Sequence, residues 1–205
     1  MPAILARKLG MTQRFNEDGR VERVTVLEAG PCPVTAIRTF DADGYESVQL
    51  GFDAVREKTL TRPQLGHLKK TGAAPMRKLV EFRDEAGELQ VGDSVTVEAF
   101  EVGHKVKISG TSKGKGFQGT IKRHRFAAGP KSHGSHNVRA PGSIGASATP
   151  SRVFKGMRMP GHMGARRVTQ RGLTVVELMP DRNLMLVRGA VPGSKGSIVE
   201  VRTDA

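Results

Sequence analysis

The chain has 205 residues, and its 33 lysines and arginines outnumber its 20 aspartates and glutamates to give a formal net charge of +13. This length suits one domain with an appendage and leaves little room for two full domains. A surface this basic attracts polyanions, so a nucleic acid or an anionic membrane is the expected class of partner.

The sequence argues against a secreted protein, a membrane-spanning protein and a protein with cysteine-based sites. The apolar run at 3–6 is shorter than the roughly 7–15 residues of a signal-peptide core, and no run in the chain approaches the ~20 apolar residues of a spanning helix. We therefore expect a cytoplasmic protein with no membrane partner. The single cysteine, Cys32, excludes an intrachain disulfide and a cysteine-based metal cluster, and its place between two prolines predicts an unreactive turn residue.

Short alternating patterns predict β-strands along much of the chain. Apolar and polar residues alternate, as in half-buried strands, over 47–52, 94–99, 105–108 and 199–202. Clusters of Gly, Pro, Asn and Asp predict turns at 16–19, 41–44, 180–183 and 192–196. One short helix is predicted over 63–70, with Pro63 in its first turn. Many short strands separated by turns favour an all-β barrel or sandwich, and we expect the barrel.

The charge is concentrated in one stretch. From Val102 to Val176 there is no aspartate or glutamate, whereas 15 lysines and arginines and five of the six histidines lie there. This stretch carries +15 and its flanks together carry −2. A solvated helix face would carry interspersed acids. The absence of acids therefore indicates a polyanionic partner for this part of the chain.

Residues 127–165, inside this stretch, are rich in glycine and proline and show neither helical nor strand periodicity. Such a segment cannot bury enough apolar surface to offset the entropy lost on ordering. Strand patterns return at 173–179 and 184–187, so both ends of the segment are tied to the globule. We predict an arm that becomes ordered inside its partner, and that is mobile and protease-sensitive without it.

The sequence GKGFQG at 114–119 matches the G-x-G-x-x-G pattern of dinucleotide-binding loops. That pattern needs a βαβ unit and an acid about 20 residues later, but Arg139 stands there and the next acid is Glu177. The glycines instead predict close approach of the backbone to phosphate, helped by Lys113 and Lys115. We expect no cofactor and no small-molecule substrate.

Two histidines of the arm, His133 and His136, have no cysteine or carboxylate partner in the stretch. They therefore predict contacts with RNA and not a metal site or a catalytic dyad. We expect no enzyme activity. Phe117 and Phe126 are predicted to pack, while Phe154 could equally pack or stack on a base.

Two functions fit the charge. A folded RNA suits an irregular, glycine-rich arm, because DNA-reading modules usually present a basic helix that this sequence lacks. The alternative is a nucleic-acid enzyme or a DNA-compacting protein, which predicts turnover or equal binding to duplex DNA. The missing acids argue against nuclease-type metal sites.

Seven runs of residues carry a family resemblance: KLGMTQRF at 8–15, GHLKK at 66–70, GTSKGKGFQGTIKRHRF at 110–126, SHGSH at 132–136, PGSIG at 141–145, VFKGMRMPGHMG at 153–164 and NLMLVRGAVPG at 183–193. In this order they resemble the bacterial members of the family of large-subunit ribosomal protein three, uL3. The resemblance covers nearly the whole chain.

The resemblance implies a mainly β fold: a six-stranded barrel of the translation-protein type with an inserted subdomain and a long irregular basic loop. The implied domains are a globule of 1–126 and 166–205, an insertion at about 53–100, and a loop of 127–165 that penetrates ribosomal RNA. The implied function is that of a structural constituent of the large (50S) subunit that binds near the 3′ end of 23S rRNA and nucleates assembly. Its loop would extend toward the peptidyl transferase centre, and large-subunit proteins fourteen and nineteen would be neighbours.

The residues expected to contact rRNA are twelve of the basic side chains and two of the histidines of the acid-free stretch: Lys113, Lys115, Lys122, Arg123, Arg125, Lys131, His133, His136, Arg139, Arg152, Lys155, Arg158, Arg166 and Arg167. One position departs from the family. Several relatives carry a methylated glutamine just before the Thr-Pro of the loop, and this chain has Ala148 there. That modification is therefore impossible in this protein.

Overall fold

The computed structural model describes residues 2–16, 18–83 and 89–204. Its internal contacts divide the chain into two compact units, one made of Met1–Ser112 and Arg167–Ala205 and the other of Lys113–Arg166. We call them the globular unit and the arm unit. No helix in the described residues is long and apolar enough to cross a membrane.

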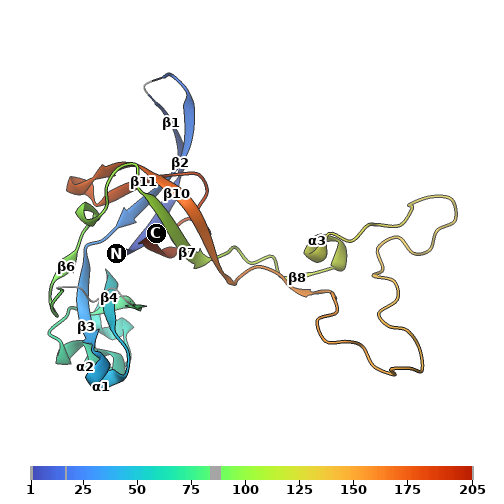
Figure 1. The fold of residues 1–205 in the computed structure, drawn as a ribbon, viewed down its shortest axis with the longest axis horizontal. Helices are drawn as coiled ribbons and strands as arrows, with labels where there is room; N and C mark the ends of the chain where they lie inside the picture. The colour runs from blue at the N-terminus through green and yellow to red at the C-terminus, as the bar shows by residue number, and fades with distance from the viewer. Residues whose placement is uncertain (1, 17, 84–88, 205) are drawn as a thin grey trace. The chain divides into compact units, whose positions relative to one another are not determined.

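A closed six-stranded barrel forms the centre of the globular unit (Figure 1). Around the barrel the strands follow the order β1 (Ala3–Phe15), β12 (Ile198–Thr203), β7 (Lys105–Thr111), β10 (Arg167–Met179), β11 (Leu184–Arg188) and β2 (Val21–Ala29). Every neighbouring pair is antiparallel. β7 and β10 are neighbours in the barrel and are also the strands that lead into and out of the arm unit.

The alternating sequence pattern explains how these strands close around a core. In β7, Val106 and Ile108 are fully buried, and in β12, Val199 and Val201 are at most 1 % exposed. Each such burial stabilises the fold by about 1.5–3 kcal/mol. At Gly110 an added Cβ would lie 2.9 Å from Cγ1 of Val199, so glycine permits the close approach of β7 and β12.

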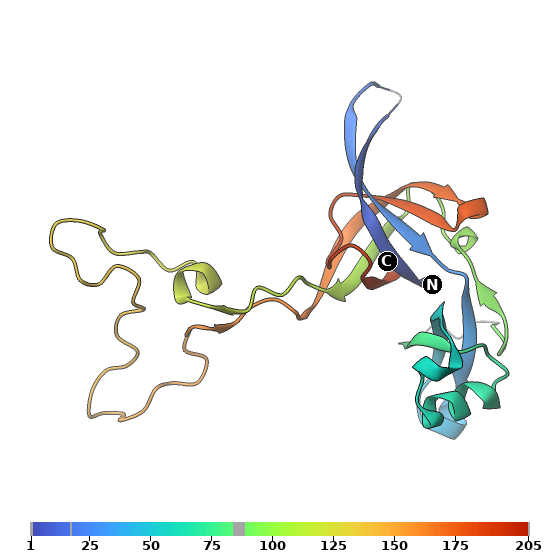
Figure 2. The ribbon, with the colours of Figure 1, turned by 180° about the vertical axis from the view of Figure 1, so that it is seen from behind.

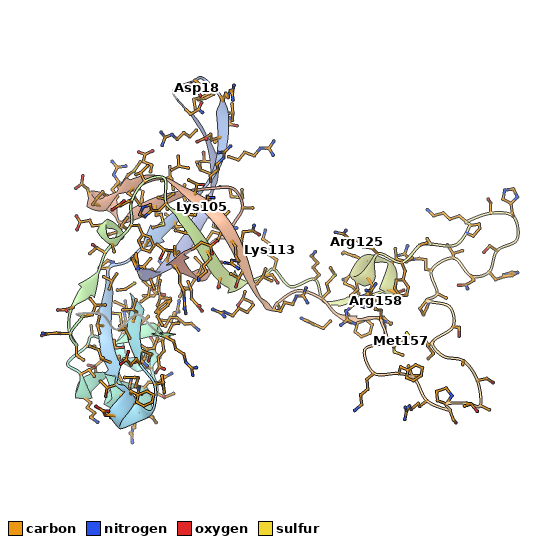
Figure 3. All side chains as sticks on the ribbon, in the orientation of Figure 1. Asp18, Lys105, Lys113, Arg125, Met157 and Arg158 are labelled. Carbon is orange, nitrogen blue, oxygen red and sulfur yellow. The ribbon has the colours of Figure 1, made fainter. Side chains whose placement is uncertain are left out.

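A second sheet lies between β2 and β7 in the chain. Its strands follow the order β5 (Met76–Arg83), β4 (Ser47–Ala54), β3 (Cys32–Arg38) and β6 (Ser94–Val95). Two short α-helices, α1 (Phe40–Asp43) and α2 (Arg62–Lys70), and the 3-10 turn η1 (Glu57–Thr59) connect these strands, and a second 3-10 turn, η2 (Val97–Ala99), follows β6 and leads to β7. Beyond the barrel, β1 and β2 continue as a two-stranded ribbon toward Asp18 (Figure 2, Figure 3).

The mainly β fold with a closed barrel is confirmed, as is the helix near 63–70. α2 has Pro63 in its first turn and a capping box between Thr61 and Gln64. The strand predicted over 94–99 is wrong beyond Val95, because η2 replaces it. The predicted turn at 41–44 is instead occupied by the single helical turn α1, which ends at Asp43 and is capped by Gly44 with φ 77°.

Two further predictions in the globular unit differ from the structure. β4 is buried on both faces from Ser47 to Phe52, where the alternation had predicted one exposed face. Cys32 begins strand β3 and is fully buried, so the predicted turn is wrong at this position. Its thiol donates to the carbonyl oxygen of Leu5 at 3.4 Å, and burial raises its pKa to about 12. The thiol therefore stays protonated and unreactive at neutral pH.

The arm unit contains little regular structure. A two-residue pairing joins β8 (Phe117–Gln118) to β9 (Gly161–His162), and the helix α3 (Thr120–His124) follows β8. Between α3 and β9 the backbone forms no helix or strand, apart from a bridge between Ser147 and Pro150. We call residues 113–126 and 159–166 the arm base, and residues 127–158 the arm loop.

Candidate nucleic-acid interface

Backbone hydrogen bonds hold the two sides of the arm base together. Phe117 pairs with His162 and Gln118 with Gly161, and this ribbon continues where Lys115 N–H donates to the Met163 carbonyl at 2.9 Å. Met163 N–H donates back to the carbonyl of Gly116 at 3.0 Å. Gly116 has φ 65°, a conformation that side chains disfavour, so this member of the G-x-G-x-x-G pattern shapes the ribbon.

Side chains of α3 fasten the helix to the returning segment. Nη1 of Arg123 donates to the carbonyl oxygen of Met159 at 2.6 Å. Nε2 of His124 lies 3.1 Å from the same oxygen and donates to it, because a carbonyl can only accept. At Gly161 an added Cβ would lie 2.8 Å from Nη1 of Arg123, so the glycine makes room for the guanidinium. α3 and β9 are thus locked by side chains as well as by backbone.

A polar hollow of about 450 Å³ lies between α3 and the segment after β9. It is lined by Arg123, His124, His162, Met163, Gly164, Ala165 and Arg166. Four of these side chains are basic or can become so, and the whole arm unit contains no carboxylate side chain. At Gly164, with φ 76°, a Cβ would lie 2.2 Å from the Lys113 carbonyl oxygen, so the wall requires glycine.

Most of the residues predicted to contact rRNA are exposed on the arm unit, spread along it instead of being gathered in one place (Figure 3). The structure brings Arg123 and Arg166 together at the hollow. The exposed members in the arm unit are Lys113, Lys115, Lys122, Arg125, Lys131, His133, His136, Arg139, Arg152, Lys155, Arg158 and Arg166. Arg167 differs, because it begins β10 in the globular unit and forms an ion pair with Glu200.

The three phenylalanines of this region behave differently. Phe117 is 76 % exposed, so the prediction that it packs is wrong: the short β8–β9 ribbon has no layer to cover it. Phe126 is half-buried with its ring centroid 6.0 Å from that of His124, as packing requires. Phe154 is 57 % exposed, and the guanidinium of Arg152 lies 5.9 Å from its ring centroid.

Two residues at the hollow, His124 and His162, were not singled out by the sequence. The short spacing of His133 and His136 made them the histidines that the sequence indicated as candidates. Both are exposed on the arm loop and do not line the hollow. His124 and His162 are distant in sequence and meet only through the β8–β9 pairing and the α3 contacts. Within the described residues no group of three or more His, Cys, Asp or Glu side chains could hold a metal ion.

Comparison with known proteins identifies the family. The model of the family described as Ribosomal protein L3 matches residues 70–181. The chain is 52 % identical over 199 residues to the large ribosomal subunit protein uL3 of Synechococcus elongatus, covering 97 % of this chain and 93 % of that one. It is 54 % identical over 204 residues to uL3 of Acidothermus cellulolyticus, covering 98 % and 92 %. For uL3 of Acaryochloris marina the identity is 51 % over 200 residues, covering 97 % and 94 %.

The expected family resemblance is therefore confirmed. The match extends over both units, and the seven runs of residues that first suggested it lie within the aligned length. The chain belongs to the ribosomal protein L3 family, whose members are structural, non-enzymatic proteins of the large ribosomal subunit.

Proposed function

We propose that this protein is a primary rRNA-binding protein of the large subunit, and that it holds 23S rRNA chiefly through the arm unit. One observation carries the proposal. The 54 residues of the arm unit contain 11 lysines and arginines and no aspartate or glutamate. Ten of the 11 are exposed, and Arg123 is half-buried. The globular unit is nearly balanced, with 22 basic against 20 acidic side chains.

The arrangement suits the phosphates of a folded RNA. Exposed cations on an extended backbone can each neutralise a phosphate and release its counterions, which gives affinity without a flat binding face. Exposed Phe154, and the glycines that let backbone approach closely, add contacts of the kind made with unpaired bases and 2′-hydroxyls. The arm loop buries no side chain of its own, so RNA would supply its order.

The finer parts of the proposal rest on family membership. They are binding near the 3′ end of 23S rRNA, nucleation of 50S assembly in the cytoplasm, and neighbouring contacts with large-subunit proteins fourteen and nineteen. The loop that penetrates RNA would be residues 127–165, directed toward the peptidyl transferase centre, with 1–126 and 166–205 as the globular part and an insertion at about 53–100. All 14 predicted contact residues remain candidates for rRNA contact.

A charge-neutralised variant tests the proposal. Arg139, Arg152, Lys155 and Arg158 are changed together to glutamine in the full chain, and binding to 23S rRNA is measured over a series of salt concentrations. Each lost phosphate contact should reduce the log-log salt slope by roughly 0.7–0.9, so the slope should fall by roughly 3. The matched control changes Arg20, Arg56, Arg62 and Arg182, four exposed arginines of the globular unit.

The control variant should leave the slope almost unchanged, although it alters the net charge equally. If the two variants reduced the salt slope equally, the position of the charge would not matter. The proposal that the arm unit is the main binding surface would then be wrong. Competition with duplex DNA separates the alternative function. If duplex DNA displaced the protein as effectively as unlabelled 23S rRNA, a general nucleic-acid compacting role would replace the proposed one.

A further inference from the structure

The arm base is organised before any RNA is present, unlike the arm loop. Its two sides are joined by the β8–β9 pairing and by the reciprocal hydrogen bonds of the 115–116 and 163 backbone. Arg123 and His124 both donate to the carbonyl oxygen of Met159, at 2.6 and 3.1 Å. The walls of the polar hollow are therefore held in place by bonds that need no ligand.

The groups around the hollow are those that recognise an oxyanion. A guanidinium has five N–H donors in a plane, so the bond from Arg123 to Met159 leaves others for a ligand. Nε2 of His124 donates to the same carbonyl oxygen, so its Nδ1 can donate to an anion only when the ring is protonated. His162 and Arg166 line the same hollow. The arm unit contains no carboxylate side chain, so no acid of this unit repels an anion from the hollow.

We infer that this hollow, lined by Arg123, His124, His162 and Arg166, is a preformed binding site for one phosphate group of RNA. The inference rests on the proposed function and adds an order of events. A phosphate is captured at the rigid arm base first, and the arm loop becomes ordered on the RNA afterwards. The volume of about 450 Å³ falls within the roughly 300–1,000 Å³ of ligand sites, so sugar atoms next to the phosphate can enter too.

A hollow in the globular unit shows the contrast. It has a volume of about 220 Å³ and is lined by Pro2, Ala3, Val48, Leu50, Phe82, Leu89, Val95 and Ala99. None of these side chains is charged, and an anion there would lose its hydration without a partner. Of these two hollows, that of the arm base is the one lined by arginine and histidine side chains.

Two substitutions that leave the net charge unchanged test the site. Gly161→Ala adds a Cβ only 2.8 Å from Nη1 of Arg123. This distance is too short for two non-bonded atoms, so the guanidinium must move. Arg123→Lys keeps the charge but loses the planar, multidentate donor. The matched controls are Gly66→Ala, where nothing lies within 4 Å of an added Cβ, and Arg62→Lys, an exposed position of the globular unit outside the hollow.

Binding of the full-length variants to 23S rRNA is measured at one fixed salt concentration. Both pocket variants should lose roughly ten-fold in affinity, the scale of one lost charge-assisted contact, whereas both controls should stay within about two-fold. Inorganic phosphate is then titrated into the wild-type chain at constant ionic strength, with the ring resonances of His124 and His162 as the readout. The proposal expects these resonances to shift in the wild-type chain and to shift less in Gly161→Ala.

The outcomes separate this inference from the proposed function. Suppose that both pocket variants bound 23S rRNA like the wild type, while the variant with four arm substitutions showed the expected reduction in salt slope. The phosphate site would then be wrong, and the proposed function would stand. If the histidine resonances responded to phosphate but RNA affinity did not depend on the pocket, the ligand would be a free anion, which also overturns the inference. If neither set of variants affected RNA binding, the function itself would fail.

Discussion

The globular unit and the arm unit are parts of one chain that are stabilised in opposite ways. Every buried apolar side chain that the structure describes lies in the globular unit, whereas Thr120 is the one buried residue of the arm unit. The globular unit is nearly neutral, and the arm unit carries 11 cations without an acid. A core makes the first unit independent of a partner, while the second leaves its charge for a partner to neutralise.

This contrast indicates a division of labour. Burial of apolar surface is strong enough to offset the entropy of ordering the barrel. The arm loop has no buried apolar surface. Acids that paired with its cations could stabilise the free loop, but they would remove its attraction for phosphate. The composition of the arm therefore favours affinity for RNA over stability of the free arm. The arm base is intermediate, because backbone and side-chain hydrogen bonds order it without an apolar core.

The largest expected effect comes from removing the arm loop. Replacing residues 127–157, all but the last residue of the arm loop, by a flexible Gly-Ser linker removes four cations while keeping Arg158, Met159 and β9. We expect 23S rRNA affinity at near-physiological salt to fall roughly a hundred-fold, because several phosphate contacts are lost together. Thermal unfolding of the globular unit should be unchanged, since no core side chain is removed. A large drop in the unfolding temperature would show that the two units are not energetically separate.

Cys32 gives a smaller effect that should belong to the globular unit alone. Burial raises the pKa of its thiol from 9.0 to about 12. The unfolded chain loses this proton more readily, so the contribution to stability is complete below about pH 9 and is lost as pH rises toward 12. At pH 10 the loss should be about 1.4 kcal/mol relative to pH 8.

Denaturant unfolding of the wild type and of Cys32→Ala at pH 8 and pH 10 measures this loss. The substitution should reduce the decrease in the free energy of unfolding between the two pH values, even if it destabilises the protein at both. The variant without the arm loop serves as the control and should keep the wild-type pH dependence. The same decrease in wild type and Cys32→Ala would exclude the thiol as its source.

Much of the globular unit could be predicted from sequence, because its strands are read by a local rule. The alternation over 105–108 and 199–202 predicted the buried faces of β7 and β12 correctly. The rule failed at 97–99, where three residues form a 3-10 turn in place of a strand. It also could not show that Lys8 is buried, with Nζ 2.6 Å from the carbonyl oxygen of Val191, since those residues are far apart in the chain.

The site divides in the same way. A count of charges was enough to find the acid-free stretch and its exposed cations. The polar hollow depends on the pairing of 117–118 with 161–162, and no periodicity encodes so short a pairing across an irregular loop. For the same reason the sequence pointed to His133 and His136 and passed over His124 and His162. A local pattern can show how much charge a region carries, but not which side chains come to share a pocket.

The smallest expected effect separates two arginines that the sequence treats alike. Arg158 is exposed on the arm loop, where there is no acid, whereas Arg167 begins β10 and already forms an ion pair with Glu200. Arg158→Gln should lower the salt slope for 23S rRNA by roughly 0.7–0.9, the value for one phosphate contact. Arg167→Gln should lower it less, because part of the charge of Arg167 is already neutralised within the globular unit.

The same two substitutions also sharpen the comparison in the free protein. Losing the ion pair with Glu200 should reduce stability by about 1 kcal/mol, because the Arg167 side chain is exposed to solvent even though Glu200 is only partly exposed. Arg158→Gln should leave stability unchanged, since this side chain touches no core. Salt-dependent binding and denaturant unfolding of both variants test this reciprocal pattern. Suppose that Arg167→Gln changed the salt slope more than Arg158→Gln did. In that case rRNA would contact the start of β10 at least as strongly as the arm loop, and the assignment of binding to the arm would have to be revised.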